Sequence, residues 1–207
     1  MTSIAGWLSP TRTIGLIAYA FAAICCGIAW ARSSGTPHPS RLAAVLALLE
    51  AGLFLDMAFS VRWHLHDLIE AEAIRKNLYA QWVGPQLAAL GLLSVAATAG
   101  MGLALQRLRG RPGTILAVCS ALLSLSLWCA EVISLHATDR VLHHAVGKVM
   151  MVGLCWFACS TMTGMGILWD NRATRSRNGP GHRTGQRARR TRAGAEMRAV
   201  ARNPRHN

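Results

Sequence analysis

Two short segments hold most of the side chains in this sequence that could bind a metal ion. One runs over residues 62–72 and the other over residues 131–144. Together they contain five of the eight histidines, interspersed with aspartate and glutamate. Imidazole and carboxylate groups are the usual protein ligands of zinc and of several other transition metals. The first hypothesis is therefore a metal site to which both segments contribute.

The spacing within the second segment supports this hypothesis. His136, Asp139 and His143 follow one another at i, i+3 and i+7, which places them on one face of a helix if the preceding apolar stretch continues as helix. His64 of the first segment would add a further ligand. We therefore predict a metal site made of His64, His136, Asp139 and His143. Zinc is the first candidate for the ion, and haem and copper are the alternatives.

Two carboxylates beside these residues are candidates for catalysis. Asp67 or Glu131 could orient a ligand histidine or act as a general base. If helix continues past Val61, then Asp56, Ser60 and Asp67 fall near one stripe, since eleven residues make about three turns. These groups indicate a metal-dependent hydrolase or redox protein that acts on a lipid or another substrate delivered by the membrane.

The histidine and acidic residues of these two segments also allow two other interpretations. In a transporter or membrane scaffold subunit, the polar groups would pass protons or a substrate, or would pair helices. In a b-type cytochrome with one haem, His64 or His66 would pair with His136 across two helices. Cys155 and Cys159 lie near several methionines and could pass copper, but buried cysteine and methionine more often serve packing.

The composition points to a membrane protein. Hydrophobic residues make up 52% of the 207 residues and charged residues only 15%, against about 25% charged in a typical soluble domain. Such a composition excludes disorder over most of the chain. A disulfide-rich secreted domain is also excluded, because there are only six cysteines and all of them lie in apolar stretches.

The elements that must position the candidate residues are long apolar stretches. A helix needs about 20 apolar residues to cross the hydrocarbon core. Five stretches meet this length, and their continuous character favours helices over a β-barrel. We expect an all-α, polytopic bundle of five transmembrane helices at Thr13–Ala31, Leu42–Val61, Gln86–Gln106, Thr114–Leu135 and Ala145–Trp169.

The basic residues predict how these helices are oriented. Sixteen of the 22 lysine and arginine residues fall on one side of the five spans, in two short loops and the C-terminal tail. Because positive charge is retained in the cytoplasm, we expect the N-terminus outside, the C-terminus in the cytoplasm and a location in the inner (plasma) membrane. Both histidine segments would then face outward.

The chain divides by composition into a five-helix transmembrane domain, residues 1–171, and an arginine-rich tail, residues 172–207. The tail has eleven arginines and almost no large apolar side chains, so we expect it to be disordered and cytoplasmic. Anionic lipids are its expected partners within the bilayer. Nucleic acid is not expected, because the tail lacks interleaved aromatic residues that stack on bases.

Overall fold

The computed structural model describes residues 9–33, 37–76, 83–133 and 140–177. The chain divides into two units, residues 1–170 and 171–207, and the fold described below is that of the first. The predicted disordered tail lies almost entirely outside the described residues.

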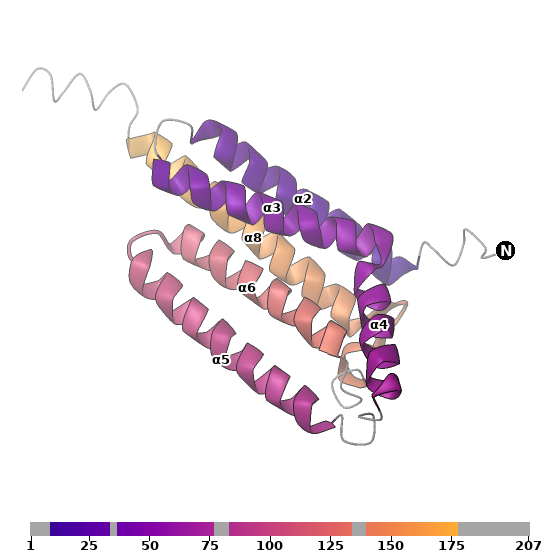
Figure 1. The fold of residues 1–207 in the computed structure, drawn as a ribbon. Coiled ribbons are helices and arrows are strands. Elements are labelled where there is room, and N and C mark those ends of the chain that lie inside the picture. Colours follow the sequence, from indigo (N-terminus) through magenta and orange to yellow (C-terminus); the bar gives the residue numbers. More distant parts are fainter. Residues whose placement is uncertain (1–8, 34–36, 77–82, 134–139, 178–207) are drawn as a thin grey trace, which may run out of the picture. The chain divides into compact units, whose positions relative to one another are not determined.

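Five long helices dominate the described part of the first unit, and Figure 1 shows their arrangement. All five are long and apolar enough to cross a membrane, which confirms the five predicted spans and the all-α class. Proline stands at the first or second position of α2 and α6, where its missing N–H costs no hydrogen bond. The helices are α2 (Pro10–Arg32), α3 (Pro37–Phe59), α5 (Val83–Arg107), α6 (Pro112–Ile133) and α8 (Met151–Arg177).

Four of these helices, α2, α3, α6 and α8, share the core. One cluster centres on small residues such as Cys26, Ala43 and Ala117, and a second contains Tyr19 and Trp156. α5 lies beside α6 and outside these clusters (Figure 1). Only 6% of its most apolar window is buried, against 44% for α8. Most of the α5 surface is therefore left for lipid or for a partner.

The helices approach most closely where α6 begins. A Cβ atom built on Gly166 would lie only 2.5 Å from the carbonyl oxygen of Gly113, so both positions need glycine. Asp170 completes this contact, because its Oδ2 accepts hydrogen bonds from the Thr114 amide at 2.6 Å and from the Thr114 hydroxyl at 2.7 Å. This end of the bundle is tightly closed.

The second span does not continue as the sequence suggested. α3 ends at Phe59, Ser60 takes a left-handed conformation with φ 58°, and a separate helix, α4 (Val61–Arg75), turns away from α3 (Figure 1). The expectation that Asp56, Ser60 and Asp67 share one stripe is therefore wrong. A left-handed residue interrupts the helical path, so positions before and after it no longer follow one periodicity.

The last span also begins later than predicted. Residues 145–150 form a short antiparallel pair, β1 (Ala145–Val146) with β2 (Val149–Met150), and α8 starts at Met151. Gly147, with φ 70°, lies in the connecting turn, where a residue without a side chain is favoured. Apolar content alone did not separate this hairpin from the helix that follows it.

Candidate functional site

The centre of the candidate site is a buried arginine. Arg62 lies in the first turn of α4 and is only 4% exposed. Its Nε is 3.0 Å from Oδ2 of Asp56 in α3, and its Nη1 pairs with Oε2 of Glu131 in α6. One guanidinium is thus shared by carboxylates from two membrane helices. An arginine placed between two carboxylates supplies the opposite charge that lets such groups be buried together.

Asp56 also fixes the start of α4. Ser60 occupies the N-cap position but makes no side-chain capping hydrogen bond. Instead, Oδ1 of Asp56 accepts a hydrogen bond from the backbone N–H of Arg62 at 2.8 Å. A carboxylate is a favourable acceptor for the free N–H groups at a helix start. The left-handed turn and the ion pair therefore depend on the same aspartate.

Trp156 and Met57 enclose the remaining faces of the guanidinium. The Arg62 Cζ lies 4.7 Å from the centroid of the Trp156 ring, a cation–π arrangement. The Arg62 Nη2 donates to the sulfur of Met57 at 3.2 Å. The Trp156 indole N–H, however, is buried and has no hydrogen-bond partner among the described residues. A buried donor without an acceptor is costly, so this N–H suits a ligand that supplies an oxygen.

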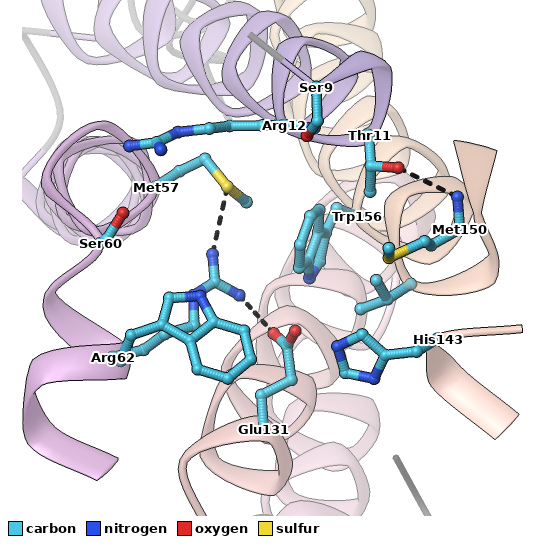
Figure 2. A pocket seen from close by; sticks show the side chains of 12 residues that line it. Ser9, Thr11, Arg12, Met57, Ser60, Arg62, Glu131, His143, Met150 and Trp156 are labelled. Atoms are coloured by element: carbon cyan, nitrogen blue, oxygen red, sulfur yellow. Dashed lines mark hydrogen bonds and ion pairs between the residues drawn. The ribbon is translucent and has the colours of Figure 1, made fainter. Parts of the chain in front are cut away.

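These groups line a pocket of about 280 Å³ at one end of the helices (Figure 2). Its walls come from α2, α3, α4, α6, α8 and the hairpin before α8. The lining residues are Ser9, Thr11, Arg12, Met57, Ser60, Arg62, Trp63, Glu131, His143, Met150, Val152 and Trp156.

Two contacts hold the N-terminal end of α2 in this pocket wall. The Arg12 guanidinium donates to the carbonyl oxygen of Ala58 at 2.8 Å, near the end of α3. The Thr11 hydroxyl oxygen accepts a hydrogen bond from the backbone N–H of Met150 at 3.0 Å (Figure 2). The pocket is therefore a joint feature of helices far apart in the sequence.

Two of the six predicted site residues lie together in this pocket. Glu131 and His143 both line it and interact electrostatically (Figure 2). The His143 ring also lies 6.3 Å from that of Trp63, centroid to centroid, at an interplanar angle of 54°. The contacts of Trp63 with His143 and of Arg62 with Glu131 bring the two polar segments together at one end of the helices.

Two further predicted residues, His64 and Asp67, are not brought to the pocket. His64 and Asp67 are exposed on α4 and do not line it, and the His64 Nδ1 lies 2.9 Å from the carbonyl oxygen of Ser60. His136 and Asp139 lie outside the described residues. Within the part of the chain that the structure describes, no three histidine, cysteine, aspartate or glutamate side chains gather as a metal site would require. Metal and haem binding stay predictions.

Sequence reasoning missed the residues at the centre of the site. Arg62 was treated as the boundary of the second span, and Arg12 and Trp156 were not considered as site residues. One signal was available: an arginine six residues after a membrane-embedded aspartate, with a second acidic residue in another span.

Comparisons of the chain with protein-family models, with curated proteins and with solved structures found no match.

Proposed function

We propose that this chain is a membrane transport protein and that its pocket admits a small carboxylate solute from one side of the bilayer. The observation that carries the proposal is the pocket itself, whose wall includes Trp156, a residue with a buried indole N–H that has no hydrogen-bond partner among the described residues. The five long apolar helices identify the chain as a multi-pass membrane protein.

The chemistry of the lining favours an acceptor-rich solute. Arg12, His143, and the hydroxyls and indoles of the wall supply hydrogen-bond donors, whereas the Glu131 carboxylate is the main charged acceptor. Arg62 is already matched by two carboxylates, so it shapes the floor and does not supply an uncompensated charge. Carboxylates accept strong hydrogen bonds from such donors. The volume limits the solute to a small molecule.

Buried polar groups that continue beyond the pocket favour transport over catalysis. Tyr19 of α2 is 1% exposed and packs with Met57 and Trp156 of the pocket wall, and Glu50 of α3 is fully buried elsewhere in the bundle. Ionisable side chains inside membrane helices commonly mark the paths of ions or substrates. An enzyme that works at the membrane surface does not need buried polar groups that continue from the pocket into the bundle.

The orientation is part of the proposal. We infer that the N-terminus lies outside and the C-terminus in the cytoplasm, because the short basic loops and the arginine-rich tail fall on one side. The pocket contains Ser9, Thr11 and Arg12 at the start of α2 and would then open outward. Fluorescent-protein fusions at the C-terminus should be bright, and alkaline-phosphatase fusions there should be inactive. The reverse pattern would contradict this orientation.

Uptake and binding assays with defined probes test the transport proposal. The purified chain is reconstituted into liposomes, and saturable uptake of labelled acetate, lactate and succinate is measured. Binding of the same probes is followed by tryptophan fluorescence. Trp156→Phe keeps the ring but removes the N–H, so we expect affinity to fall about tenfold, the value of one hydrogen bond of about 1.4 kcal/mol.

A matched control variant is Trp30→Phe, which changes an exposed tryptophan in α2 outside the pocket. It should leave uptake and binding unchanged. Absence of saturable uptake for all three probes would contradict the proposal. Equal affinities of Trp156→Phe and the wild type would contradict the role given to the indole N–H.

A metal site is the second candidate, favoured by one observation: Glu131 and His143 line the same pocket. His136 and Asp139 lie between them in the sequence. Zinc, iron and copper in the purified chain are measured by mass spectrometry for the wild type, His136→Ala and His143→Ala, with His206→Ala as control. Stoichiometric metal that both site variants lose would support this candidate. Metal far below one equivalent, without a haem absorption band, would contradict it and the haem alternative.

A further inference from the structure

A third buried carboxylate, Glu50, lies outside the pocket. Glu50 is near the middle of the Ser40–Phe59 span in α3 and is fully buried, with 0% exposure. Its Oε2 accepts a hydrogen bond from the Ser160 hydroxyl of α8 at 3.2 Å. Its Oε1 has no hydrogen-bond partner among the described residues.

Hydroxyl and thiol groups face this carboxylate, and no cation among the described residues pairs with it. Ser160 and Thr163 of α8 are both fully buried and interact with it. The titratable groups that face it are Tyr19 and Cys26 of α2 and Cys159 of α8. Within the described parts of the chain, no lysine, arginine or histidine forms an ion pair with Glu50.

What Glu50 can bind depends on its surroundings, which differ from those of a carboxylate in water. A carboxylate anion without a counter-charge is strongly disfavoured in an apolar interior, whereas a neutral carboxylic acid is tolerated when hydrogen-bonded. Ser160 donates to one oxygen, which leaves the unpartnered Oε1 as the position for a proton. A proton satisfies the charge without needing the several oxygen ligands of a metal cation.

We propose that Glu50 is a reversible proton-binding site in the middle of the membrane span. A hydronium ion gives its proton to Oε1, so that the carboxylate becomes a neutral acid and water is released. Tyr19, which faces Glu50, packs in one buried cluster with Met57 and Trp156 of the pocket wall. The proposal stands apart from the transport function, because proton binding is measured without any solute.

Dicyclohexylcarbodiimide tests the proposal directly. This apolar reagent reacts with protonated carboxyl groups: the carboxyl oxygen bonds to the carbodiimide carbon, the proton moves to nitrogen, and rearrangement gives a stable N-acylurea with no leaving group. The full-length chain in liposomes is treated over a range of pH and mapped by peptide mass spectrometry. We expect labelling at Glu50 that falls as the pH rises, and little at Glu131, whose Oε2 is paired with Arg62.

Matched variants and a second measurement keep the result interpretable. Glu50→Gln should lose the label, whereas Glu131→Gln should keep it at Glu50. Infrared difference spectra of the same liposomes should show a protonated-carboxyl C=O band that is absent from Glu50→Gln. This band reports the proton even where the reagent fails to reach the site.

Three outcomes would overturn the proposal. Absence of both the label and the infrared band at every pH would show that no proton is bound. Labelling that does not change with pH would contradict reversible binding. Protection by sodium at constant pH would assign the site to a metal cation instead. Failure of carboxylate uptake with labelling intact would refute only the transport function.

Discussion

Two buried glutamates in this molecule are stabilised in opposite ways. Glu131 lies near the end of α6, where the first turn of α4 brings Arg62 to it. Glu50 lies in the middle of α3, where the Ser160 hydroxyl donates to it and no ion pair is formed among the described residues. The comparison teaches that the depth of an acidic residue in a span decides its partner. Near the ends a neighbouring segment can supply an arginine, and in the middle neutralisation by a proton is the cheaper solution.

The arginine reaches its position because the chain breaks at Ser60. The left-handed residue turns α4 away from α3, and Asp56 then caps α4 and pairs with Arg62 at once. The region around Arg62 is therefore held by charge and by one strained residue. The region around Glu50 is held by packing of small and hydroxyl-bearing residues.

Removal of the shared arginine should have the largest effect on stability. Arg62→Ala leaves Asp56 and Glu131 buried without a counter-charge, and we expect a loss of about 3–5 kcal/mol in the free energy of unfolding. Denaturant unfolding in detergent micelles measures this loss. The triple variant Arg62→Met, Asp56→Asn, Glu131→Gln should recover most of it. Unfolding of Arg62→Ala at the wild-type midpoint would contradict the assigned ion pairs.

Neutralising each glutamate in turn tests the comparison itself. Glu131→Gln should cost about 1–3 kcal/mol, because it removes a charge-assisted hydrogen bond to a buried guanidinium. Glu50→Gln should change stability by less than about 0.5 kcal/mol at neutral pH, because an amide replaces an uncharged acid of the same shape. The same unfolding assay measures both. A larger loss in Glu50→Gln would mean that Glu50 is ionised and has a partner.

The coarse fold could be predicted from the sequence because a helix that crosses the membrane needs only a sufficient length of apolar residues. Continuous apolar length identified all five helices, with bounds within a few residues for most of them. The break at Ser60 could not be predicted, because serine carries no preference for a left-handed conformation and both flanking segments are good helices alone. The hairpin before α8 was hidden in an apolar run.

The site could be predicted only in part, because the break at Ser60 and the tertiary packing around Arg62 leave no clear pattern in the sequence. Glu131 and His143 were selected from residue type and side of the membrane, and they line one pocket. His64 and Asp67 were selected on the assumption of a continuous helix, and the turn at Ser60 leaves them exposed. The role of Trp156 depends on tertiary packing over Arg62, which no local pattern in the sequence reveals.

The conformation of Ser60 gives a smaller and more local test of the arginine region. Ser60→Val places a β-branched residue at φ 58° and should cost about 1–2 kcal/mol, whereas Ser60→Gly should be neutral or stabilising by less than about 1 kcal/mol. Unfolding midpoints measure both effects. Because α4 carries Arg62, Ser60→Val should also weaken probe binding in the pocket. Similar stability of the two variants would contradict the left-handed turn.

Of the ion pairs compared, the exposed one on α4 should have the smallest effect on stability. Hydrogen bonding from Arg75 at 2.8 Å, with Lys76 at 3.0 Å, lowers the pKa of Glu72. Because the folded-state pKa is the lower one, this pairing supports α4 above the ordinary glutamate pKa and is lost as the pH falls below about 4. Hydrogen exchange of the last α4 turn should therefore quicken slightly on acidification, and Glu72→Gln should abolish that change. In contrast to Arg62→Ala, neither change should move the global unfolding midpoint, because water and salt screen exposed charges.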